Sequence, residues 1–211
     1  LIAQFHCELA EQARAGGQAE EARRQGQEAL AADPRCVRAH MLLGRLAKAA
    51  DATEAAIRHF EKAAEIDPDF LSEILCDLLE CYEARQDGAR AEAFLDLMTQ
   101  RDRGVAALLA RSAMIERSQG RSVAVDFLAD KLHQRPSVRG VLKVMDLSFP
   151  DDSSERAGTV TLIRDLLHRL LDRKPGYRCS RCGFSPRALH WQCPSCKSWG
   201  RASSGWTTAT T

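Results

Sequence analysis

The chain has 211 residues, of which 45% are hydrophobic, and its 30 basic and 29 acidic residues leave a net charge of +1. This composition supports an ordinary packed core, and the balanced charge argues against bulk electrostatic attraction to nucleic acid or to an anionic membrane. The longest apolar runs fall far short of the roughly 20 residues that a membrane span needs, and no signal-peptide pattern opens the chain. The chain starts at Leu1 inside a predicted helix whose apolar side lacks a partner. We therefore expect it to be a fragment with further repeats upstream.

The first two thirds of the chain repeat with a period of 34 residues. Pro34 and Pro68 are one period apart, Pro136 lies two periods beyond Pro68, and Asp102 interrupts the series. A helix-turn-helix unit of this length is the tetratricopeptide repeat. We expect about four units within residues 1–136, of which the last two are degenerate: Ala3–Pro34, Val37–Pro68, Leu71–Asp102 and Val105–Pro136.

The second unit resembles the tetratricopeptide consensus most closely. It matches at Leu43, Gly44, Ala56, Phe60, Ala63 and Pro68. It departs at His40, where the consensus has tryptophan, and at Ala47, where the consensus has tyrosine. Gly44 is expected to let two helices cross closely, and Phe60 to fill the gap against the next unit. Pro68 ends the second helix because proline cannot continue the backbone hydrogen-bond ladder.

Residues 137–174 lose the period but keep helical patterns, and we expect an extra helical pair that caps the array. Val138–Leu147 is a short apolar segment, and either Ser153 or Ser154 is placed to cap the helix that follows. That helix carries an apolar stripe at helical spacing, formed by Leu162, Ile163, Leu166, Leu167, Leu170 and Leu171. The stripe is either ordinary core or the place where the next module docks.

Residues 175–200 form a small module with two C-x-x-C turns separated by ten residues, followed by a tail over 201–211. Cys179, Cys182, Cys193 and Cys196 are expected to hold one metal ion, because all-sulfur tetrahedral coordination selects zinc or iron. Gly183 is expected to take the positive φ that such a turn needs. Apolar cover comes from Tyr177, Phe184, Trp191 and Trp199. Since the module is too small for a core of its own, metal binding supplies most of its folding energy.

The remaining cysteines and histidines indicate no enzyme. Cys7, Cys36, Cys76 and Cys81 are scattered through helical segments without a basic cluster at a helix start, so we expect small buried thiols in a reducing compartment. His6 and His40 share a repeat position, which predicts packing. We expect no catalytic residue and no bound organic cofactor.

The spacing of the four cysteines does not distinguish iron from zinc. The string Y-x-C-x-x-C-G-F…C-P-x-C resembles rubredoxin, which favours iron. The same string is similar to the zinc ribbon that opens a bacterial recombination ATPase, which favours zinc. No acidic residue follows Asp172, and the module carries five cations. They form either a solvated face that offsets the charge of the thiolates or a patch for an acidic partner.

Helical repeats followed by a rubredoxin-like knuckle resemble the lipopolysaccharide assembly protein B family. The specific stretches are Arg135–Asp146 and Lys174–Trp199. The resemblance implies an all-α tetratricopeptide superhelix, a right-handed α-solenoid, with a small C-terminal metal knuckle. It also implies metal ligands at Cys179, Cys182, Cys193 and Cys196, no catalytic residue, and an N-terminal membrane helix with more repeats outside this chain.

The resemblance further implies an adaptor on the cytoplasmic face of the bacterial inner membrane. Such an adaptor brings the deacetylase that commits lipid A synthesis to an FtsH-type membrane AAA+ protease, and thereby restrains lipopolysaccharide output. Other lipopolysaccharide-assembly membrane proteins are further implied partners. The sequence leaves the oligomeric state open, a homo-oligomer included.

The two alternatives to an adaptor are an electron-transfer protein and a nucleic-acid-binding zinc ribbon. A rubredoxin-like electron-transfer protein needs iron and a redox partner, but the chain has no G-x-G-x-x-G motif and no sign of a flavin. A nucleic-acid-binding zinc ribbon is disfavoured by the neutral net charge and by the absence of a phosphate-binding loop.

Overall fold

The computed structural model describes residues 1–101, 105–149, 157–172 and 175–204. Its helices pair along the chain as α1 (Ile2–Ala15) with α2 (Ala19–Ala32), α3 (Val37–Ala49) with α4 (Thr53–Ile66), α5 (Leu71–Ala84) with α6 (Gly88–Arg101), and α7 (Ala106–Gln119) with α8 (Arg121–Gln134). The pairs follow the expected 34-residue period, and α1 begins one residue before the first expected unit. The predicted all-α tetratricopeptide solenoid is therefore confirmed.

Beyond the paired helices, the chain forms α9 (Val138–Ser148) and α10 (Ala157–Asp172). It ends in a two-stranded antiparallel sheet of β1 (Tyr177–Cys179) and β2 (Ala202–Ser204), in which Cys179 lies opposite Ala202. The sequence placed residues 202–204 in the tail, and they are instead the second strand. The candidate caps Ser153 and Ser154 lie outside the described residues.

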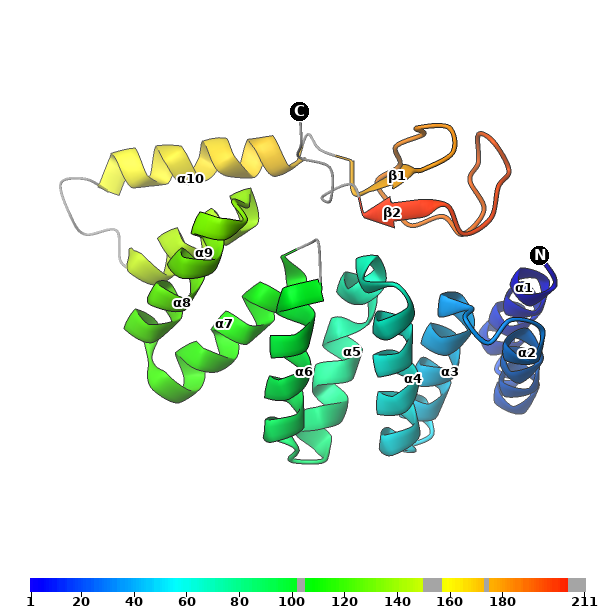
Figure 1. Ribbon diagram of the computed structural model, residues 1–211. Helices are drawn as coiled ribbons and strands as arrows, with labels where there is room; N and C mark the ends of the chain where they lie inside the picture. Colours follow the sequence, from blue (N-terminus) through cyan, green and yellow to red (C-terminus); the bar gives the residue numbers. More distant parts are fainter. Residues whose placement is uncertain (102–104, 150–156, 173–174, 205–211) are drawn as a thin grey trace.

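The helix pairs stack side by side into an arc (Figure 1). After α9 the chain turns back along one side of this arc, so that α10 and the strands lie on the same side of it. The strands lie over the N-terminal half of the array, far in sequence from the repeats that they face. The C-terminal module therefore covers the first repeats and does not extend the array.

The same aspartate-proline turn ends the second helix of the first two repeats. After α4, the Asp67 carboxylate accepts a hydrogen bond from the backbone N–H of Asp69 at 3.1 Å, and Pro68 opens the short 3-10 helix η1 (Pro68–Phe70). After α2, Asp33 accepts from the backbone N–H of Arg35 at 3.0 Å. Proline lacks the N–H that a continuing helix would need, while the aspartate satisfies the turn that replaces it.

The sequence correctly predicts a close helix crossing at Gly44. A Cβ atom built on Gly44 would lie 2.6 Å from the ring of Phe60, whose side chain is fully buried. Phe60 belongs to the largest core cluster, together with Ile57, Leu71 and Ile74. The glycine lets α3 approach α4 closely enough for one phenylalanine to fill the space between them.

Two cysteine placements differ from expectation. Cys76 is exposed, whereas Cys7, Cys36 and Cys81 are buried as predicted. Cys36 does lie at a helix start, one residue before α3, with its sulfur 3.8 Å from that of Cys7. The Cys7 thiol and the backbone N–H of Ala39 lower the pKa of Cys36 to about 7. Sequence spacing does not predict this contact, because the two cysteines come from different repeats.

The histidines also form a contact that sequence spacing hides. His40 and His59 lie 19 residues apart on α3 and α4, and their Nδ1 atoms are 3.1 Å apart. His40 Nε2 donates to the carbonyl oxygen of Pro34, which leaves its Nδ1 to accept a hydrogen bond from His59. Burial lowers the pKa of both rings. The predicted packing role of His40 therefore includes a polar partner in the same repeat.

We expect Gly44→Ala to lower the free energy of unfolding by about 1–2 kcal/mol, because the clash with buried Phe60 outweighs the gain in helix propensity. Urea unfolding followed by circular dichroism measures the change. Gly88→Ala is the matched control, since nothing lies within 4 Å of its added methyl group. Equal stability of the two variants would contradict the close crossing of α3 and α4.

Candidate functional site

The four cysteines of the C-terminal module converge on one point. The Sγ atoms of Cys179, Cys182, Cys193 and Cys196 all lie within 4.8 Å of one another. Cys179 and Cys196 are 3.8 Å apart at sulfur, and Cys182 and Cys193 are 3.7 Å apart. A metal–sulfur bond of ~2.3 Å in a tetrahedron gives sulfur–sulfur edges of ~3.8 Å. The cysteines are thus positioned to bind a metal ion.

Two similar backbone turns bring the sulfurs together. In each turn the residue after the second cysteine donates its N–H to the carbonyl oxygen of the first, from Gly183 to Cys179 and from Lys197 to Cys193, both at 2.9 Å. Both donors have positive φ, 78° at Gly183 and 57° at Lys197. The positive φ predicted for Gly183 is confirmed, and Lys197 adopts the same conformation without being glycine.

Hydrogen bonds to sulfur favour the thiolate form that a metal requires at Cys179 and Cys196. The backbone N–H of Cys182 lowers the pKa of Cys179. Ser198 lowers the pKa of Cys196 to about 6 through its hydroxyl, 2.7 Å from the sulfur, and through its backbone N–H. At Cys193, the backbone N–H of Cys196 acts to lower the pKa, but burial and the neighbouring thiols outweigh it and raise the pKa to about 11. Cys179 and Cys193 are buried, while Cys182 is exposed. One side of the cluster is therefore shielded by the fold and the other faces solvent.

Aromatic stacking holds the module against the array. Trp191 stacks on Phe70 of η1, with ring centroids 5.1 Å apart and an interplanar angle of 13°. Trp191 and its neighbour Leu189 also pack against the largest core cluster of the repeats. Phe70 follows the turn that ends the second repeat, so a repeat boundary supplies the platform on which the module rests.

A buried arginine completes this contact. The Arg38 guanidinium lies 5.6 Å from the ring centroid of Trp191 and 6.0 Å from that of Trp199, within the range of cation–π attraction. Its side chain is 3% exposed and forms ion pairs with Glu8 and Glu11 of α1, each at 2.7 Å. Burial alone would lower the pKa of Arg38, but the two carboxylates outweigh it and raise the pKa.

A third contact comes from the start of the module. The Tyr177 hydroxyl donates a hydrogen bond to Glu73 of α5. Burial, together with this hydrogen bond, raises the pKa of Tyr177. Together, Glu73, Arg38 and Phe70 fix the module on three elements that lie far from it in sequence. Sequence reasoning missed all three residues, because no local pattern marks a contact between segments more than 100 residues apart.

The apolar stripe of α10 takes neither of its expected roles. Leu162, Ile163, Leu166 and Leu170 are exposed, and only Leu167 and Leu171 are partly covered. The metal module docks on α3, α5 and η1 and not on this stripe. The five cations of the module are all exposed: Arg178, Arg181, Arg187, Lys197 and Arg201.

These features define the class of protein as a tetratricopeptide-repeat protein with a docked rubredoxin-like metal module. Comparison with family models agrees: residues 47–112 match the tetratricopeptide repeat, and residues 177–201 match the rubredoxin metal binding domain. Among solved structures, the crystal structure of MamA protein is similar at 15% identity and a TM-score of 0.45, over 81% of this chain and 88% of that one.

The more specific relationship comes from whole-chain similarity. Lipopolysaccharide assembly protein B of Escherichia coli K12 is 30% identical over 199 residues, and that of Haemophilus influenzae is 34% identical over 202. Both alignments cover 94% of this chain and about half of the relative, 51% and 50%. The chain is therefore similar to lipopolysaccharide assembly protein B along nearly its whole length, and the predicted resemblance is confirmed. No helix within the described residues is long and apolar enough to cross a membrane.

We expect Arg38→Ala to loosen the module from the array. The change removes the cation from Trp191 and leaves Glu8 and Glu11 without a partner. Because both carboxylates are partly exposed, the expected loss is about 1–2 kcal/mol, below the value for a fully buried pair. Acrylamide should quench tryptophan fluorescence more strongly than in the parent chain. Arg23→Ala, which breaks an exposed pair on α2, is the control and should leave quenching unchanged. Identical quenching in both variants would contradict the role of Arg38.

Proposed function

We propose that this chain is part of an adaptor that regulates lipopolysaccharide synthesis by presenting the lipid A pathway deacetylase to an FtsH-type membrane AAA+ protease. The observation that carries the proposal is the order of parts: the similarity to lipopolysaccharide assembly protein B runs through both the repeats and the metal module. A repeat array offers an extended surface for protein partners. An adaptor needs no catalytic residue, so the chain is not an enzyme. The site of action would be the cytoplasmic face of the inner membrane.

We further propose that the metal has a structural role. One iron or zinc ion, bound by Cys179, Cys182, Cys193 and Cys196, would close the two turns and so hold Trp191 in place. The ion contributes folding energy to a module whose two strands are only three residues long. The repeats would contact the partners, and the module would fix the shape of the N-terminal half of the array.

The adaptor function predicts faster degradation of the deacetylase. In a reconstituted membrane system, the full-length protein that contains this chain should shorten the half-life of the deacetylase in the presence of the protease and ATP. The effect should saturate at stoichiometric amounts, since the adaptor binds and does not turn over. The half-life is measured by gel densitometry, with an unrelated substrate of the protease as the control. An unchanged half-life of the deacetylase would refute the adaptor function.

The structural role of the metal predicts a local effect of its loss. We expect Cys193→Ser to reduce metal content, measured by mass spectrometry, and to increase acrylamide quenching of Trp191 while most helical ellipticity remains. Cys76→Ser, at an exposed thiol in α5, is the matched control. Visible absorption of the parent protein distinguishes an iron tetrathiolate from a zinc one. A metal-free variant with unchanged quenching would show that the ion does not hold Trp191.

A further inference from the structure

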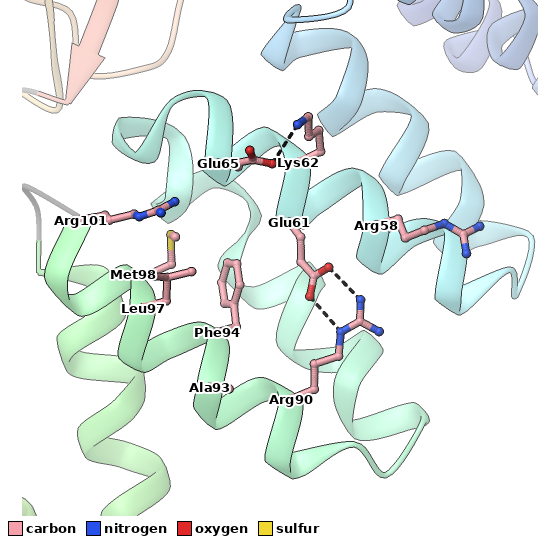
Figure 2. Close-up of a pocket in the computed structure, with 10 residues that line it drawn as sticks. All are labelled: Arg58, Glu61, Lys62, Glu65, Arg90, Ala93, Phe94, Leu97, Met98 and Arg101. Atoms are coloured by element: carbon pink, nitrogen blue, oxygen red, sulfur yellow. Dashed lines mark hydrogen bonds and ion pairs between the residues drawn. The ribbon is translucent and has the colours of Figure 1, made fainter.

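A groove runs between α4 and α6, the second helices of two consecutive repeats (Figure 2). Its volume is about 600 Å³. The lining residues recur every three or four positions on each helix, so the groove follows one face of α4 and one face of α6. The metal module does not contribute to its lining. The groove is therefore separate from the contact between the module and the array.

The lining carries more positive than negative charge. It contains Arg58, Lys62, Arg90 and Arg101 but only Glu61 and Glu65 as acids. In Figure 2, Arg58 and Arg90 lie toward one end of the groove, and Arg101 with Glu65 toward the other. The groove thus presents cations near both of its ends.

One end is rigid because its charges already have partners. Arg90 donates two hydrogen bonds to Glu61, at 3.0 and 2.8 Å, and Tyr82 donates a third to the same carboxylate at 2.6 Å. Arg90 also reaches Glu54 at 3.2 Å. This network holds the wall of the groove in place, so Arg90 and Glu61 form part of the scaffold.

Other cations remain available to a ligand. The Arg58 side chain is 66% exposed, and its ion pair with Glu54 on the same helix is long, at 3.9 Å. Arg101 is exposed at the end of α6. Lys62 pairs with Glu65 at 2.9 Å, but both side chains are about half exposed, and such surface pairs contribute little. A carboxylate ligand could therefore interact with Arg58 and Arg101 without breaking a buried pair.

The part of the groove between these cations is apolar. Phe94 and Met98 are buried beneath the surface, whereas Leu97 is 42% exposed. Leu97 therefore offers an apolar contact between two positively charged ends. The pattern of cation, apolar residue and cation fits a ligand with the complementary order of charges.

We propose that this groove binds a helical segment of a protein partner in which two carboxylates flank an apolar side chain. Arg58 and Arg101, the two cations that remain available to a ligand, lie toward opposite ends of the groove. Carboxylates seven residues apart on a helix are ~10 Å apart along its axis, and their side chains extend that reach. Apolar residues three and four positions after the first carboxylate would then face Leu97. This inference rests on the proposed adaptor function and adds a docking surface and a class of partner to it.

The test uses a designed probe and a reversal of charge. A fluorescein-labelled synthetic helix carries two glutamates seven residues apart with leucines three and four positions after the first. Its binding to the chain is followed by fluorescence anisotropy. We expect Arg58→Glu combined with Arg101→Glu to weaken binding by about tenfold or more. The matched control reverses Arg23 and Arg24, two exposed arginines of α2 outside the groove, and should bind like the parent.

A second peptide tests whether binding depends on the sign of the charges. With both glutamates replaced by lysine, it should bind the double variant of Arg58 and Arg101 better than the parent chain. Circular dichroism confirms that the variants fold. The proposal is overturned if both peptides bind all variants equally. It is also overturned if sedimentation shows self-association that the double variant abolishes, since the groove would then join two copies of the chain. Failure here leaves the degradation assay unaffected, so the groove and the adaptor function fail separately.

Discussion

The contact of Trp191 with Phe70 and Arg38 determines how the rest of the structure is arranged. It joins the module with the four candidate metal ligands to the array of helices. Stacking supplies apolar contact, and the guanidinium adds attraction to the electron-rich ring faces. Arg38 can be buried in this position only because Glu8 and Glu11 neutralise it. One tryptophan therefore connects the metal turns with α1, α3 and η1.

The position of the module determines which surfaces of the array are covered and which stay exposed. The module covers one side of the N-terminal repeats (Figure 1), while the groove between α4 and α6 remains open (Figure 2). Partner binding and structural support can thus reside on different faces. The exposed leucines of α10 form another uncovered surface. The chain spans about half the length of the relatives that it matches.

The metal turns illustrate how a very small unit acquires a fixed shape. The two strands are three residues long and would not pair stably alone. Four sulfurs within 4.8 Å of one another are positioned to bind one metal ion, whose positive charge would offset the repulsion between thiolates. In the proposed structural role, the ion would order the turns, and the array receives Trp191. Without contact to the array, the same module would depend on the metal ion alone for a fixed shape.

The repeat architecture and the candidate metal ligands can be predicted from the amino-acid sequence alone, because both depend on local patterns. The 34-residue period follows from helix lengths and proline turns, and two C-x-x-C turns bring pairs of cysteines together wherever they occur. The crossing at Gly44 was predictable because a residue without a side chain indicates close approach. Positive φ at Gly183 followed from the geometry of the turn.

The docking position of the module on the array, and the residues that contact it there, are visible only in the folded chain. Arg38, Phe70 and Glu73 look like ordinary repeat residues, and their role appears only when the chain folds back over the array. The pairing of Cys7 with Cys36 and of His40 with His59 likewise joins different helices. The α10 stripe shows the converse: helical spacing predicted an apolar face but not what covers it. Spacing along a helix fixes which residues share a face, whereas contacts between distant segments depend on the path of the whole chain.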